Sequence, residues 1–100
     1  MDTSDLQRGL ARADTAAVSI LYFARLREAL GRDREQLVLT AEVKTVGDLR
    51  ALLRARGGAW ETELAPAKPV RVAVNQSMAQ LESPVGPGDE VAFFPPVTGG

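Results

Sequence analysis

The chain has 100 residues, of which 45% are hydrophobic and 25% are charged, and its formal net charge is −1. This is the composition of one globular domain, and it lacks the strongly basic balance of nucleic-acid-binding proteins. No run approaches the ~18 apolar residues of a membrane span. We therefore expect neither nucleic acid nor a membrane as a partner.

Cysteine and histidine are both absent from the sequence. Their absence removes disulfides, thiolate nucleophiles, the commonest metal ligands, and Ser-His-Asp or Cys-His catalysis. We therefore expect no metal site and no bound cofactor. Any chemistry has to use carboxylates, lysine, hydroxyl groups or a chain terminus.

Residues 1–17 are polar and small, and they predict a flexible N-terminal extension. They lack the apolar stretch of a secretory signal, and Asp2, Asp5 and Asp14 are untypical of a transit peptide. A cytoplasmic location is the expectation.

The first half of the folded region predicts two strands separated by a short helix. Residues 18–23, "VSILYF", are β-branched and aromatic and predict a buried strand. Residues 24–31 predict a short helix that ends at Gly31. Residues 34–40, "REQLVLT", predict a second strand, whose nearness to the first indicates a hairpin.

The clearest helix begins after Thr45, which is an N-cap candidate with Asp48 in the capping-box position. One apolar stripe runs along it, and Gly57 supplies the left-handed residue that ends it. The stripe consists of Val46, Leu49, Leu52 and Leu53. Arginines flank this stripe and are interleaved with acidic residues along the chain, which predicts a solvated face.

Residues 59–69 predict a connection that two prolines interrupt. Residues 70–75 alternate strictly and predict a third strand, which ends in a turn at Asn75 and Gln76. Residues 78–81, "MAQL", suggest a short edge strand.

Residues 86–89, "GPGD", predict a turn, and residues 90–94, "EVAFF", predict the last strand. Phe93 and Phe94 are adjacent, so they point to opposite faces of the sheet. One belongs in the core. Phe94, if it is the other, lies on the open face, where an aromatic side chain suits a partner contact.

One main helix with four or five strands predicts an α+β protein in which a mixed sheet packs against that helix. This is the β-grasp, or ubiquitin-like, architecture. The expected organisation is an extension over residues 1–17, a β-grasp domain over 18–94, and an extended tail over 95–100.

The tail, "PPVTGG", leaves the last strand through two prolines that favour an extended backbone. Six residues reach at most about 20 Å, far enough to enter a pocket in another protein. Gly99 and Gly100 have no Cβ atom, so a narrow channel could admit them. We interpret Gly100 as a terminal carboxylate that is presented to an activating enzyme.

Three segments resemble the family of small, sulfur-carrying subunits of molybdopterin synthase, within the ubiquitin-like β-grasp superfamily. They are "LYFARLREALG" at residues 21–31, "VNQ" at 74–76 and "GDEVAFFPPVTGG" at 88–100. The likeness covers roughly residues 18–100, and the C-terminal block is its most specific part. The extension before residue 18 departs from the family.

The resemblance implies that an adenylating enzyme uses ATP to convert the carboxylate of Gly100 into an acyl-adenylate. A sulfur donor protein then replaces AMP and leaves a thiocarboxylate. The tail enters the large subunit of a heterotetrameric synthase, which carries the catalytic residues, and the sulfur builds the dithiolene of the molybdenum cofactor. Phe94, Pro95, Pro96, Val97, Thr98 and Gly99 would contact the partner.

The residues leave three alternatives open. The chain could carry sulfur for another product, such as the thiazole of thiamine or a thiolated nucleoside. It could be a ubiquitin-like modifier that is joined to other proteins through Gly100. It could also be an interaction module whose tail is incidental.

Overall fold

The computed structural model describes residues 17–96. Residues 1–16 and 97–100, with most of the predicted extension and tail, lie outside the described residues. In chain order the elements are β1 (Ala17–Tyr22), α2 (Ala24–Leu30), β2 (Arg34–Val38), α3 (Val46–Arg54), α4 (Ala59–Glu63), β3 (Arg71–Val74), β4 (Ser77–Met78) and β5 (Glu90–Phe94).

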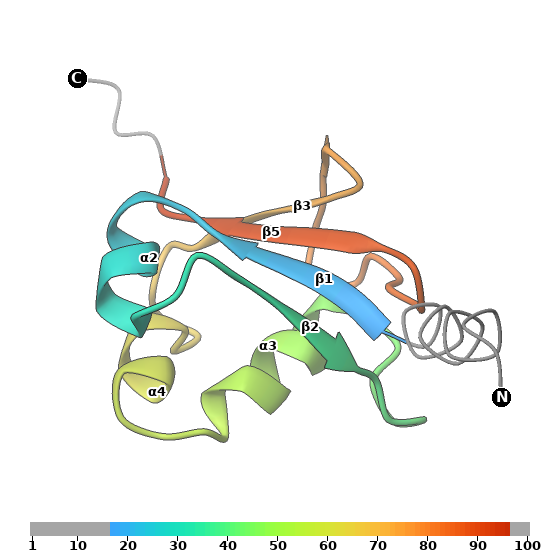
Figure 1. Cartoon of the computed structure of the whole chain (residues 1–100), viewed down its shortest axis with the longest axis horizontal. Helices are drawn as coiled ribbons and strands as arrows, with labels where there is room; N and C mark the ends of the chain where they lie inside the picture. The colour runs from blue at the N-terminus through green and yellow to red at the C-terminus, as the bar shows by residue number, and fades with distance from the viewer. Residues whose placement is uncertain (1–16, 97–100) are drawn as a thin grey trace, which may run out of the picture.

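The strands form one mixed five-stranded sheet in the order β2-β1-β5-β3-β4. The central pair, β1 and β5, is parallel, and the other pairs are antiparallel. The three helices lie on one side of this sheet, with α3 crossing beneath it (Figure 1). This arrangement confirms the predicted β-grasp fold.

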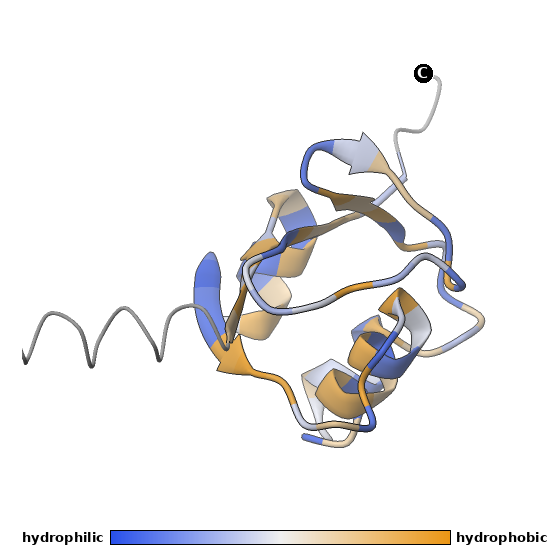
Figure 2. Cartoon of the chain, turned by 90° about the vertical axis from the view of Figure 1, so that its right-hand side faces the viewer, coloured by the Kyte–Doolittle hydropathy of each residue, from blue (hydrophilic) through white to orange (hydrophobic). Residues whose placement is uncertain are grey.

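The core fills the space between α3 and the sheet. Thr45 caps α3 as predicted, since its Oγ1 accepts from the Asp48 amide at 3.2 Å while Asp48 Oδ2 accepts from the Thr45 amide at 3.2 Å. Val46, Leu49 and Leu53 of the predicted stripe are fully buried. Strands and helices both carry hydrophobic residues interleaved with hydrophilic ones (Figure 2). This pattern is expected of elements that pack one face against a core and expose the other to solvent.

The prediction that residues 59–69 form only a connection was wrong, because Ala59–Glu63 is the helix α4. Gly57 and Gly58 both have positive φ, which reverses the chain directly after α3. Their carbonyls then accept from the amides of Trp60 and Thr62 and start a new turn. The prolines, which suggested an irregular segment, lie after this turn.

The predicted edge strand at 78–81 is shifted, since β4 comprises only Ser77–Met78. After Ala79 the chain leaves β3 and runs to the start of α3, where the carbonyl of Leu81 accepts from the Gly47 amide at 2.9 Å. A Cβ atom at Gly47 would lie 3.3 Å from that carbonyl oxygen, so a glycine suits this close approach.

Arg50 departs from the prediction of a solvated arginine face. Its Nε donates to the carbonyl of Leu64 at 2.8 Å, and its Nη2 donates to those of Ala65 at 2.6 Å and Lys68 at 3.1 Å. Burial lowers the pKa of this guanidinium, which binds neutral carbonyls here. Arg50 thereby holds the α4–β3 connection against α3.

A second cluster joins the other end of α3 to the sheet. The ring of Tyr22 stacks on Phe93 with 6.3 Å between centroids and meets Trp60 edge-on at 5.4 Å. The guanidinium of Arg56 lies 4.3 Å from the Trp60 ring centroid. Such aromatic and cation–π contacts add to the stability that burial supplies.

Glu35 on β2 lies at the centre of this cluster. Its carboxylate accepts from the Tyr22 hydroxyl at 2.6 Å and from both Nη atoms of Arg56 at 2.8 Å. Burial alone would raise the pKa of Glu35, but the hydrogen bonds from Arg56 and Tyr22 and the nearby positive charges outweigh it and hold the pKa below its usual range.

The variant Glu35→Gln should lower the free energy of unfolding by about 1–3 kcal/mol, because it leaves Arg56 without its carboxylate at nearly constant side-chain size. Urea unfolding at pH 7 measures this loss. The exposed Glu28→Gln is the control and should change stability by less than about 0.5 kcal/mol.

The stability difference between the wild type and Glu35→Gln should depend on pH. Because folding lowers the pKa of Glu35, its stabilisation is present above the unfolded pKa of about 4.3 and is lost as pH falls through the folded pKa. The unfolding free energies of the wild type and Glu35→Gln should therefore converge below about pH 4. A gap that stays constant into strong acid would contradict this account.

Candidate functional site

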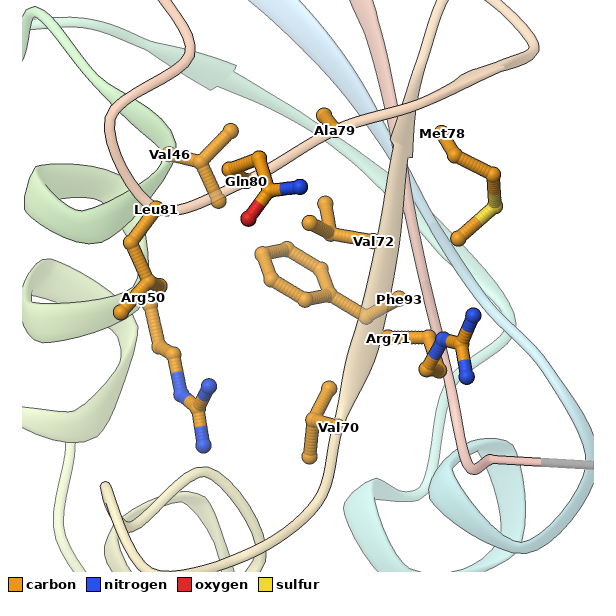
Figure 3. A pocket seen from close by; sticks show the side chains of 10 residues that line it. All are labelled: Val46, Arg50, Val70, Arg71, Val72, Met78, Ala79, Gln80, Leu81 and Phe93. Atoms are coloured by element: carbon orange, nitrogen blue, oxygen red, sulfur yellow. The ribbon is translucent and has the colours of Figure 1, made fainter.

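The register of β5 decides which of its side chains reach the core. Tyr22, Phe93 and Val72 are partners across β1, β5 and β3, and all three are buried. The ring of Phe93 points toward Val46 and Arg50 of α3 (Figure 3). The prediction that one phenylalanine of the pair lies in the core is confirmed, and that residue is Phe93.

The alternate residues of the same strands line the open face. Leu21, Ala92, Ala73 and Met78 are successive partners across β1, β5, β3 and β4. Met78 and Arg71 point to the opposite side of β3 from Phe93 (Figure 3). An apolar row thus crosses the sheet on the face that no helix of residues 17–96 covers.

A second row lies beside the first, at the edge where β5 ends. Phe94 is the register partner of Arg71, and it is half-buried. The amide of Phe23 donates to the Phe93 carbonyl at 3.1 Å, which places Phe23 at the same end of the sheet. We call the residues Leu21, Phe23, Met78 and Phe94 the docking face.

The docking face exposes much apolar surface. The side chains of Phe23 and Met78 are 47% and 59% exposed. The prediction that residues 18–23 form a buried strand was therefore wrong at Phe23, which follows the end of β1 and which alternation after the buried Tyr22 turns outward. Ser19 and Leu21 are only partly buried. Exposed apolar side chains that share one face are typical of a protein interface.

The tail leaves the sheet directly beside the docking face. Pro95 and Pro96 follow β5 without an intervening turn, and both are half-buried. They line a small hollow with residues of α2 and of the segment before β3. The predicted site residues Val97, Thr98, Gly99 and Gly100 lie outside the described residues.

Other parts of the described surface bear on the chemistry that the chain can support. Within residues 17–96, no group of three or more His, Cys, Asp or Glu could hold a metal ion. A groove of about 410 Å³ opens between α3 and β3, and its lining is a mixture of polar and apolar residues. Of its two arginines, Arg50 is bonded to three carbonyls and Arg71 is exposed. In the same part of the chain, no helix is long and apolar enough to cross a membrane.

The sequence predicted Phe94 and the prolines as partner contacts, and the structure adds Phe23 and Met78 to the exposed apolar residues of the same face. Alternation was the available signal for Phe23, since it follows a buried tyrosine by one residue. Met78 had no such signal, because a two-residue strand is too short to show a period.

Comparison with known proteins identifies the family. The family model described as the ThiS family matches residues 20–100. This chain belongs to that family. It is 41% identical over 83 residues to the molybdopterin synthase sulfur carrier subunit of Escherichia coli, an alignment that covers 83% of this chain and 99% of the relative.

Solved structures agree with the fold. A putative molybdopterin converting factor, subunit 1, from Pyrococcus furiosus has a TM-score of 0.68 at 30% identity, covering 82% of this chain and 99% of that one. The small archaeal modifier protein 1 of Haloferax volcanii also has a TM-score of 0.68, at 29% identity and the same coverage.

A third structure is a complex of subunits 1 and 2 of the molybdopterin-converting factor from Helicobacter pylori. Its matching chain has a TM-score of 0.56 at 21% identity, covering 84% of this chain and 99% of that one. This likeness shows a shared fold.

The two adjacent phenylalanines should differ in what they contribute to stability. Phe93→Leu should cost about 1–2 kcal/mol of unfolding free energy, because it opens space in the core, whereas Phe94→Leu should cost under about 0.5 kcal/mol. Chemical denaturation of the matched pair measures both. Equal losses would place Phe94 in the core and remove it from the docking face.

Proposed function

We propose that this chain is the sulfur carrier subunit of a molybdopterin synthase and that Gly100 carries the sulfur. The observation that carries the proposal is the family match over residues 20–100, which includes the Gly-Gly end. It is supported by a relative of that name at 41% identity. The position of the tail beside an exposed apolar face also suits a subunit that delivers its terminus to another protein.

The proposed chemistry begins with the low reactivity of the Gly100 carboxylate. A carboxylate is a poor electrophile, so an adenylating enzyme first joins it to AMP with release of pyrophosphate from ATP. Sulfide-level sulfur supplied by a sulfur donor protein then attacks the acyl carbon, expels AMP and leaves a thiocarboxylate. This group is ionised at neutral pH and is a soft nucleophile, which explains how a chain without cysteine can carry sulfur. Because the reaction consumes ATP, we expect it to take place in the cytoplasm.

The parts of this chain have separate tasks in the proposal. The docking face binds the large subunit, which supplies the catalytic residues. Pro95 and Pro96 restrict the backbone and direct the tail away from the sheet. Val97 and Thr98 position Gly100, and Gly99 keeps the end of the tail narrow enough to enter the active site of the large subunit.

A modifier function is the second candidate, because a small archaeal modifier protein is among the structural neighbours. It requires the same activated terminus but a lysine as acceptor. Cell extracts would then contain conjugates of higher mass that disappear when Gly100 is deleted.

Tail variants test the proposed function in a reconstituted synthase. Deleting Gly100 should abolish conversion of the pterin precursor, and Gly99→Val should reduce it at least tenfold because the side chain obstructs a narrow channel. Melting curves of both should match the wild type. The control is Gly86→Val, a glycine with open space around it, which should keep full activity.

Undiminished conversion by Gly99→Val would contradict the narrow channel. Undiminished conversion after deletion of Gly100 would contradict the sulfur-carrier assignment itself.

A further inference from the structure

Positively charged side chains surround the point where the tail leaves the domain. Arg71 is exposed, and it is the register partner of Phe94 on the open face. Arg25 and Lys68 lie on the other side, where they line the hollow beneath Pro95 and Pro96. The base of the tail therefore lies between cations on two sides.

The hollow itself is small and mostly apolar. Its volume is about 60 Å³, and Leu26, Pro69, Val70, Pro95 and Pro96 form most of its walls. Arg25 and Glu63 form an ion pair of 2.9 Å on its rim, with the Arg25 side chain 63% exposed. The shape and lining suit one apolar side chain of a partner, with room for polar contacts at the rim.

The charges at the base of the tail do not balance. Glu63 is the single carboxylate among the residues that line the hollow, and it is already paired with Arg25. Neither Lys68 nor Arg71 forms an ion pair with a described residue. Because the whole chain has a net charge of −1, this positive character is local and lies where the docking face meets the tail.

The opposite end of β5 has the reverse character. Asp89 and Glu90 precede and begin the strand there. A partner that approaches along the tail meets the basic end first. A partner with acidic side chains is therefore attracted to this end in the productive orientation, which raises its association rate.

We propose that the large synthase subunit carries acidic side chains around the mouth of the channel that receives the tail, opposite Lys68 and Arg71, and fills the hollow with an apolar side chain. This inference rests on the proposed function, since it concerns the partner that takes up the same tail. The basic residues orient the complex, and the docking face and hollow supply the contact area that holds it.

Charge reversal tests the proposal with purified large subunit. The double variant Lys68→Glu/Arg71→Glu should slow association by about tenfold or more in low salt, and this difference should shrink as ionic strength rises. Arg25 is left unchanged so that its ion pair with Glu63 survives. The control is Lys44→Glu, which changes an exposed lysine near the start of α3 and should leave the association rate within about twofold.

The outcomes distinguish a failure of the acidic mouth from a failure of the proposed sulfur-carrier function. Unfolding curves establish that the double variant is folded, and saturating concentrations of the large subunit should restore product formation by its thiocarboxylate. If the double variant associates with the large subunit as fast as Lys44→Glu does, the acidic mouth is overturned. It is also overturned if the association rate depends on salt with the adenylating enzyme but not with the large subunit. If the wild type itself does not bind the large subunit, the proposed function has failed.

Discussion

The parallel pairing of β1 with β5 determines how the other features of this molecule are arranged. It joins the two ends of the described chain at the centre of the sheet, so the last strand is held on both edges. Tyr22 and Phe93 are paired within the core, and Leu21 and Ala92 are paired on the open face. The tail therefore starts from a strand that is paired on both edges, and Phe23 and Phe94 lie at the same end of the sheet.

The helical side stabilises this central pair, and among the described residues no helix packs on the open side. Glu35, Arg56 and Trp60 hold the edge strand and the end of α3 against Tyr22. Arg50 holds the α4–β3 connection, whose residues Lys68 and Pro69 form part of the hollow at the base of the tail. Side chains that lie far from the docking face thus set the shape of the surface around the tail.

Patterns of period two and of helical spacing predicted most of the fold. The capping box at Thr45, the last strand and the burial of one phenylalanine are local properties, and the structure confirms them. Helix α4 was missed because two glycines with positive φ restart the helical pattern, which sequence periodicity does not show. The role of Arg50 was missed because its three carbonyl partners lie 14 to 18 residues away in the chain. The docking face was predicted only at Phe94, since a two-residue strand brings in Met78 through pairing alone.

The central claim is that the carboxylate of Gly100 becomes a thiocarboxylate. The most direct test is the intact mass of the protein, tagged only at its N-terminus, after incubation with the adenylating enzyme, ATP and a sulfur donor protein. The account predicts a mass gain equal to the exchange of one oxygen for one sulfur, and no gain in the variant that lacks Gly100. An unchanged mass, with an adenylating enzyme shown to be active on a known carrier, would contradict it.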